Sequence, residues 1–130
     1  MTPQHHPVQT AGADLTCERF ADHTVIAISG ELDVSSTPSL RERLYVALRD
    51  PGMYVVIDLS GMTFCDASGL AMLVGAQRRL EGDGTGLILA RPRPHTARLL
   101  RVTGLSRAFT VRPPAAWAPA GDSDPRSAAA

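Results

Sequence analysis

One short stretch constrains the fold more than any other part of the sequence. The segment Met53-Tyr54-Val55-Val56-Ile57-Asp58-Leu59 is almost continuously apolar and is interrupted only by Asp58. Such a run is typical of a central strand covered on both faces, as the strands of parallel sheets are. Parallel strands are joined by long crossover connections, which are usually helices. The run therefore predicts an α/β protein in which helices flank this strand along the chain.

The neighbouring segments show the alternation that this prediction requires. Residues 15–20 and 24–29 are expected to form two strands of a hairpin. In the next segment Thr37 is the expected N-cap of a helix and Pro38 its first residue. The apolar side chains of that helix recur on one face, at Leu40, Leu44, Ala47 and Leu48. After the central strand we expect a helix over 68–80, a strand over 86–90, a helix over 95–102 and a strand over 109–112.

Right-handed crossovers between these elements predict one α/β domain with a mixed, mostly parallel sheet of about five strands and three or four helices. We expect the domain to span residues 14–112. Residues 1–13 are expected to be a flexible arm, and the Pro/Ala-rich residues 113–130 a disordered tail. Trp117 in this tail is interpreted as a solvated aromatic, with docking as the alternative.

Composition excludes several functional classes. The chain has no lysine, which excludes a Walker-type phosphate loop, a Schiff-base lysine and a Ser–Lys dyad. The formal net charge is +0, so no general attraction to nucleic acid or to an anionic membrane is expected. His23 and His95 are the only histidines of the expected domain, so we predict no metal and no cofactor. No signal-peptide pattern and no membrane-spanning apolar run is present, and we expect a cytoplasmic protein with reduced cysteines.

The sequence Asp66-Ala67-Ser68-Gly69 places small and polar residues between the central strand and the next helix. Ser68 could simply cap that helix with its hydroxyl. Its expected position, just beyond the carboxyl end of a central strand, is also where open α/β sheets gather functional groups. A carboxylate at Asp66 could orient the hydroxyl, and Gly69 would permit close approach of another backbone. A helix start also stabilises a phosphate.

Two enzymatic alternatives have less support. The sequence around Ser68 is not the G-x-S-x-G nucleophile elbow, and no histidine is predictably close to it. Cys65 could be a redox thiol, but a buried and inert cysteine at the end of a strand fits its apolar surroundings better.

Three separate blocks give the chain a family resemblance: "ISGELDVSSTPSLRERL", "VVIDLSGMTFCDASGLAMLV" and "GLILARPRPHTARLLRVTGL". In this order they closely resemble the STAS family, the anti-sigma factor antagonists of bacteria. The resemblance covers residues 14–112. It implies that Ser68 is the phosphoacceptor of an ATP-binding serine kinase, which is itself the anti-sigma factor. Ala67 departs from the family, since many members carry Ser or Thr there.

The resemblance also implies a function. The unphosphorylated protein would bind and sequester the anti-sigma factor kinase and so release a sigma factor. Phosphorylation of Ser68 would end this binding, and a serine phosphatase would restore it. The protein would act as a monomer or weak dimer and would not be an enzyme. The implied partner-binding residues are Asp33, Ser35, Ser36, Asp66, Ala67 and Gly69.

Alternatives remain at this stage. The domain could be a scaffold in a signalling assembly or a sensor of a small ligand, and an enzyme using Ser68 is less well supported. If Ser68 is not the acceptor, the neighbouring hydroxyls of Ser35, Ser36 and Thr37 are the next candidates.

Overall fold

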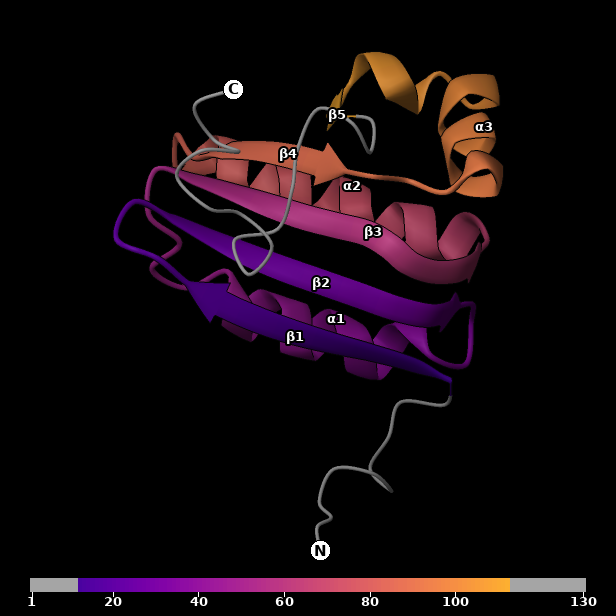
Figure 1. The fold of residues 1–130 in the computed structure, drawn as a ribbon, viewed down its shortest axis with the longest axis horizontal. Helices are drawn as coiled ribbons and strands as arrows, with labels where there is room; N and C mark the ends of the chain where they lie inside the picture. The colour runs from indigo at the N-terminus through magenta and orange to yellow at the C-terminus, as the bar shows by residue number, and fades with distance from the viewer. Residues whose placement is uncertain (1–11, 113–130) are drawn as a thin grey trace, which may run out of the picture.

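A computed structural model describes residues 12–112 and contains one mixed five-stranded sheet in the order β1-β2-β3-β4-β5 (Figure 1). β1 runs antiparallel to β2, and all other neighbouring strands are parallel. This confirms the predicted fold class. The elements are β1 (Ala13–Arg19), β2 (His23–Leu32), α1 (Thr37–Ala47), β3 (Tyr54–Cys65), α2 (Ala67–Gly82), β4 (Gly86–Ala90), α3 (Pro94–Val102), the short 3-10 helix η2 (Leu105–Arg107) and β5 (Thr110–Arg112).

The expected ends of the domain are met only in part. Ala13, which the sequence analysis assigned to the arm, opens β1 and is buried, so the sheet begins earlier than residue 14. The remainder of the arm, apart from Gly12, lies outside the described residues. The same is true of the tail from residue 113 onward and therefore of Trp117.

The main core lies between the sheet and the helices α1 and α2, which both pack on one face of the sheet (Figure 1). The predicted stripe of α1 is confirmed, because Leu40, Leu44, Ala47 and Leu48 are all buried. β3 contributes Val55, Ile57 and Leu59 to this face, each with 0% exposure. No helix of residues 12–112 is long and apolar enough to cross a membrane.

The opposite face of the sheet differs from the expectation of helical cover. It carries a separate apolar cluster of Val25, Val56 and Ala90, with Tyr54 and Ile88 packed against it. All five side chains come from β2, β3 and β4, and no helix of the described part of the chain contributes to the cluster. The side chains are nevertheless buried or half-buried, so this face has a hydrophobic centre of its own.

β2 and β3 extend further than the sequence analysis predicted. β3 continues through Ser60-Gly61 to Cys65, and β2 continues to Leu32. A Ser-Gly pair is typical of turns, but here the strands stay paired, and the register between β2 and β3 shifts twice, between Ala27 and Ser29 and between Gly30 and Glu31. Such irregularities allow strands to stay paired past residues that would otherwise end them. The extension carries β3 directly to the start of α2.

The start of α1 corrects the expected cap. Ser36 is the N-cap, Thr37 begins the helix, and Pro38 occupies its second position. Thr37 lies inside the first turn rather than before it, and its hydroxyl donates to the carbonyl oxygen of Asp33. The Ser36 hydroxyl donates to the carbonyl oxygen of Glu31, 2.7 Å away, and its side chain makes no capping hydrogen bond to the helix.

Candidate functional site

The junction between β3 and α2 is organised by Asp66. This residue has extended backbone angles and is the N-cap of α2, and its side chain accepts hydrogen bonds from the backbone N–H groups of Ser68 and Gly69. Its own backbone N–H donates to the carbonyl oxygen of Leu32, 3.1 Å away, which ties the junction to the end of β2. Asp66 thus supplies the cap that the sequence analysis assigned to Ser68, and the Ser68 hydroxyl is free of that task.

The Ser68 hydroxyl lies in the first turn of α2 and is half-buried. It donates a hydrogen bond to Oδ1 of Asp66 over 2.6 Å, a short distance that is typical of a hydroxyl bound to an ionised carboxylate. The positive end of the helix dipole lies at the same place. The site therefore combines an oriented hydroxyl with a helix terminus that can stabilise added negative charge.

The loop after β2 forms the other side of this site. Oδ1 of Asp33 accepts hydrogen bonds from the backbone N–H groups of Ser35 and Ser36 and from the Ser35 hydroxyl, at 3.0, 3.1 and 2.8 Å. The Ser36 hydroxyl in turn accepts from the backbone N–H of Asp33. These bonds close the loop on itself and fix its position at the start of α1.

The two halves of the site meet at two hydroxyls. Oγ1 of Thr37 and Oγ of Ser68 lie 3.3 Å apart, although the residues are 31 positions apart in the sequence. Each hydroxyl has a single hydrogen. The hydrogen of Ser68 is directed to Asp66 and that of Thr37 to the carbonyl of Asp33. The contact therefore brings two oxygens close together without adding a strong bond, and Thr37 limits the space beside Ser68.

Both carboxylates of the site remain ionised at neutral pH. The hydrogen bond from the Ser68 hydroxyl and those from the backbone N–H groups of Gly69 and Ser68 hold the pKa of Asp66 below its ordinary value. The nearby charge of Asp33 opposes this lowering of the pKa. Hydrogen bonds from Ser35 and Ser36 lower the pKa of Asp33. A charge added at Ser68 would therefore enter a surface that is already negative.

The structure brings all the predicted site residues to one end of the sheet, but these residues differ in their exposure to solvent. Ser35 and Ala67 are exposed, and Asp33, Asp66 and Ser68 are half-buried. Ser36 and Gly69 are buried. That these two contact a partner stays a prediction; in the domain itself their side-chain positions face the interior and shape the loop and the helix start.

Gly69 is required by the close packing of α2 on the sheet. A Cβ atom at this position would lie 2.7 Å from Sγ of Cys65 and 2.8 Å from Cβ of Leu32. Real Cβ atoms essentially never approach that closely. The close neighbours are side chains rather than the backbone that the sequence analysis expected, and this packing holds the first turn of α2 against the ends of β2 and β3.

The sequence analysis missed the apolar surface around this site. Val34 is 73% exposed and Phe64 is 41% exposed, and the Phe64 ring stacks on His95 of α3 with 5.9 Å between ring centroids. A shallow groove of about 420 Å³ begins at Ala67 and runs along α2. It is lined by Ala67, Leu70, Ala71, Val74, Gly75 and Arg78 of α2 and by Leu105 of η2. In the sequence, the only signal for this surface was that the apolar residues Val34 and Phe64 lie next to the polar site residues.

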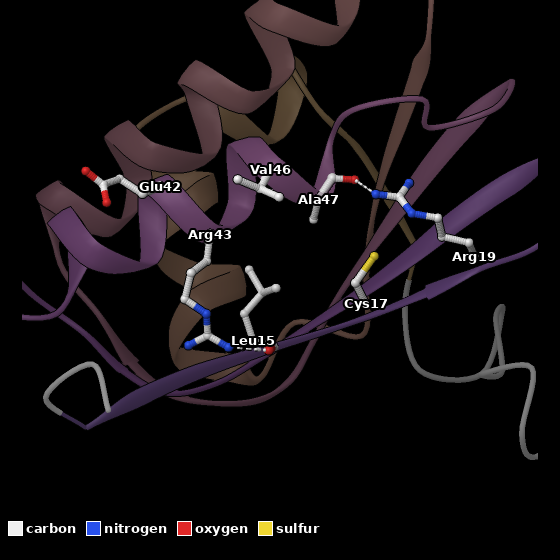
Figure 2. A pocket seen from close by; sticks show the side chains of 7 residues that line it. All are labelled: Leu15, Cys17, Arg19, Glu42, Arg43, Val46 and Ala47. Atoms are coloured by element: carbon white, nitrogen blue, oxygen red, sulfur yellow. Dashed lines mark hydrogen bonds between the residues drawn. The ribbon is translucent and has the colours of Figure 1, made fainter. Parts of the chain in front are cut away.

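A second groove, of about 600 Å³, lies away from this site, between β1 and α1 (Figure 2). Its two arginines are already engaged. Arg43 binds the carboxylate of Asp14 and the carbonyl of Leu15, and Arg19 binds the carbonyls of Ala47 and Asp50 near the end of α1. The groove contains none of the predicted site residues, and its cations serve the packing of α1 on the edge strand.

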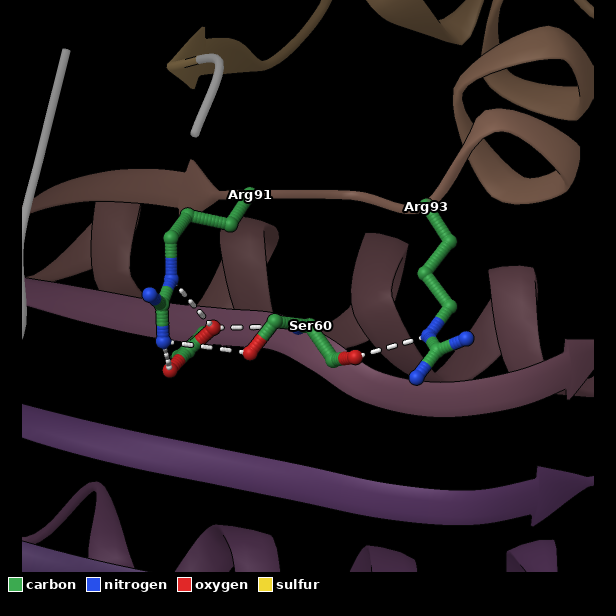
Figure 3. A network of polar contacts seen from close by, with 4 residues as sticks. Ser60, Arg91 and Arg93 are labelled. Atoms are coloured by element: carbon green, nitrogen blue, oxygen red, sulfur yellow. Dashed lines mark hydrogen bonds and ion pairs between the residues drawn. The ribbon is translucent and has the colours of Figure 1, made fainter. Parts of the chain in front are cut away.

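Asp58, the one charge in the central apolar run, has a structural partner. Figure 3 shows the network that contains it, with Arg91 donating to both carboxylate oxygens of Asp58 at 3.3 and 2.7 Å. Arg91 also donates to the Ser60 hydroxyl, and Arg93 donates to the Ser60 carbonyl. Burial alone would raise the pKa of Asp58, but the hydrogen bonds from Arg91 and Ser60 lower it below its ordinary value. The network ties β3 to the segment that follows β4.

Cys65 is 1% exposed, which fits the interpretation of a buried and inert cysteine. Burial, assisted by the charge of Asp66, raises the pKa of its thiol to about 12. No cluster of metal-binding side chains occurs among the described residues.

The two cysteines are expected to differ sharply in reactivity, because the thiolate is the reactive species. At pH 8 only about one Cys65 thiol in ten thousand is ionised if its pKa is about 12. Iodoacetamide should therefore alkylate the exposed Cys17 and spare Cys65 in the folded protein. Peptide mass mapping checks this, with the protein in urea as the control in which both cysteines react. Rapid labelling of Cys65 in the folded state would contradict its burial.

Comparison with known proteins places the chain in a family. The family model described as "Mlab, STAS domain" matches residues 16–113. The anti-sigma-B factor antagonist of Listeria monocytogenes is 33% identical over 95 residues, which cover 73% of this chain and 83% of that protein.

Solved structures agree with this match. The crystal structure of an anti-sigma factor antagonist from Mycobacterium paratuberculosis superposes with a TM-score of 0.71 and 30% identity, covering 78% of this chain and 86% of that one. SpoIIAA in its unphosphorylated form gives a TM-score of 0.63 at 23% identity, over 75% of this chain and 87% of that one. The likeness to SpoIIAA concerns the fold.

Proposed function

Because the chain belongs to the STAS-domain family of anti-sigma factor antagonists, we propose that it binds and sequesters an anti-sigma factor and is switched by phosphorylation of Ser68. The anti-sigma factor would be an ATP-binding serine kinase that modifies Ser68, and a serine phosphatase would reverse the modification. The protein acts as a regulatory binding protein in the cytoplasm, where sigma factors work, and not as an enzyme.

The observation that carries this proposal is the short hydrogen bond from the Ser68 hydroxyl to Asp66 at the start of α2. The bond holds one hydroxyl oxygen in a defined orientation on a half-buried but reachable surface. Asp66 is ionised and keeps the helix capped whether or not the hydroxyl is modified, since it also binds two backbone N–H groups. Modification of Ser68 therefore need not unfold the start of α2.

The surroundings of Ser68 favour binding in the unmodified state. Ala67 is exposed beside it and begins the apolar groove along α2, and Val34 and Phe64 are exposed at the same end of the sheet. Exposed apolar surface of this kind is typical of a protein contact. A partner that covers this surface would exclude water from the neutral Ser68 hydroxyl.

Phosphorylation would make the same surface unsuitable for that partner. A phosphoserine carries about −1.5 to −2 charges at neutral pH. The charge would lie beside Asp66 and near Asp33, whose pKa values are both lowered and whose carboxylates are therefore ionised. The helix start would stabilise the phosphate on the domain itself. A partner surface that accepts a neutral hydroxyl would instead face several uncompensated charges.

Phosphate incorporation is expected to depend on Ser68 alone. Incubation with a candidate anti-sigma factor kinase and ATP should add one phosphate to the wild-type protein and none to Ser68→Ala, as intact-mass measurement would show. Ser35→Ala is the matched control and should still accept one phosphate, because Ser35 is an exposed hydroxyl of the neighbouring loop. Full incorporation into Ser68→Ala would move the acceptor to another residue. Ser35 would then be favoured over Ser36 and Thr37, which are 0% and 1% exposed.

A further inference from the structure

The hydroxyl of Thr37 lies beside Ser68 but has no part in the function proposed so far. Its Oγ1 atom is 3.3 Å from Oγ of Ser68, and the two residues belong to different helices, α1 and α2. Within residues 12–112 the side chain of Ser68 has two hydrogen-bonding neighbours, Asp66 and Thr37. Of these two, only Thr37 can donate a hydrogen bond, because an ionised carboxylate only accepts.

Phosphorylation of Ser68 would change the hydrogen bonding at its side chain. The hydroxyl hydrogen that now binds Oδ1 of Asp66 would be replaced by a phosphoryl group, whose oxygens are strong acceptors. Hydrogen bonds hold the pKa of Asp66 below its ordinary value, so its carboxylate would stay ionised and repel the phosphate. The phosphate would therefore be directed away from Asp66, and Thr37 is the other side chain in contact with the oxygen that carries it.

The hydrogen of the Thr37 hydroxyl can leave its present partner without orphaning that partner. It now donates to the carbonyl oxygen of Asp33. The same oxygen also accepts hydrogen bonds from the backbone N–H groups of Ser36 and Thr37, at 3.2 and 3.0 Å. A carbonyl oxygen has two lone pairs, so these two bonds would keep it satisfied. A hydroxyl hydrogen rotates to suit its acceptor, and no heavy atom of α1 has to move.

We propose that the Thr37 hydroxyl turns from the Asp33 carbonyl to the phosphate of phosphorylated Ser68 and holds that phosphate on the domain. Hydrogen bonds to an ionised acceptor are about twice as strong as those between neutral groups, which favours the phosphate over the carbonyl. Thr37 is buried in the first turn of α1, so its oxygen is already fixed in place. The inference rests on the proposed phosphorylation of Ser68, and it makes Thr37 a positioning residue of that switch.

The test uses protein in which phosphoserine is incorporated in place of Ser68 during synthesis, so that no kinase is required. Phosphorus NMR at a series of pH values then follows the second ionisation of the phosphate. A donor that binds the more highly charged form lowers the pKa of the group. The wild type and Thr37→Ser should therefore share a low phosphate pKa. Thr37→Val has nearly the same shape without a hydroxyl and should show a higher phosphate pKa.

Thr103→Val is the matched control for the loss of a threonine hydroxyl. Thr103 also donates to the carbonyl oxygen four residues before it, that of Leu99, over 2.8 Å, but it lies at the end of α3. This variant should leave the phosphate pKa at the wild-type value. Thr37→Ala is a second variant without the hydroxyl and should agree with Thr37→Val, and circular dichroism checks that every variant is folded.

Three results would overturn the proposal. Equal phosphate pKa values in the wild type and in Thr37→Val would show that the hydroxyl does not bind the phosphate. A pKa of Thr37→Ser as high as that of Thr37→Val would show that the hydroxyl is not the group that matters. An equal rise in Thr103→Val would show that contact with Ser68 is not required.

This inference and the proposed function fail separately. The NMR experiment does not depend on whether any kinase modifies Ser68, which the intact-mass measurement decides. A kinase that left Ser68 unmodified would remove the proposed function and would not alter the phosphate pKa. An unchanged pKa in Thr37→Val would remove the role of Thr37 and leave the phosphorylation of Ser68 as proposed.

Discussion

Leu73→Ala is expected to lower the free energy of unfolding by about 2–5 kcal/mol, the usual cost of truncating a fully buried leucine. Leu73 is 0% exposed and belongs to the core cluster between α2 and the sheet. The substitution removes apolar contacts and leaves a cavity in a core where α2 is held tightly at its start by Gly69. The neighbouring helix cannot collapse far into that space.

Urea unfolding measures this effect as a lower midpoint with an unchanged slope. The matched control is Glu81→Ala, which alters an exposed side chain of the same helix and should change the stability by less than about 0.5 kcal/mol. An equally small change for Leu73→Ala would contradict the packing of α2 on the sheet.

Ser68→Asp is expected to weaken binding of the anti-sigma factor by about 100-fold or more. The substitution places a carboxylate next to Asp66 in the proposed contact surface, and like charges brought together in an interface cost several kcal/mol. Every 1.4 kcal/mol corresponds to about a tenfold change in the dissociation constant. Ser68→Ala should bind nearly as well as the wild type, because the surface stays neutral and Asp66 still caps the helix.

Ser68→Asn separates charge from size, since asparagine has the shape of aspartate without its charge. Titration calorimetry with the anti-sigma factor should place Ser68→Asn much closer to Ser68→Ala than to Ser68→Asp. All three variants should keep the circular dichroism of the wild type. If Ser68→Asp and Ser68→Asn were weakened equally, steric exclusion would explain the effect and the charge switch would be wrong.

Much of the fold could be predicted because its signals are local. The apolar stripe of α1 and the apolar run of β3 each reflect contacts that repeat with the period of one element. The change from the apolar run of β3 to the small and polar residues Asp66 to Gly69 also predicted that Ser68 lies at the start of the next helix. The ends of β2 and β3 were predicted less well, because Ser60-Gly61 favours a turn locally whereas pairing with β2 carries the strand past it.

The sequence by itself determined the order of the elements, the class of sheet and the hydroxyl at the start of α2. Only the tertiary structure decided that Asp66 rather than Ser68 caps the helix, that Thr37 lies beside Ser68, and that Ser36 is buried. It alone also revealed that the second face of β3 is buried without a described helix over it. The physical reason is the range of the contacts. Periodicity records which residues of one element share a face, whereas the 3.3 Å approach of Thr37 and Ser68 depends on how β2 and β3 are aligned with each other.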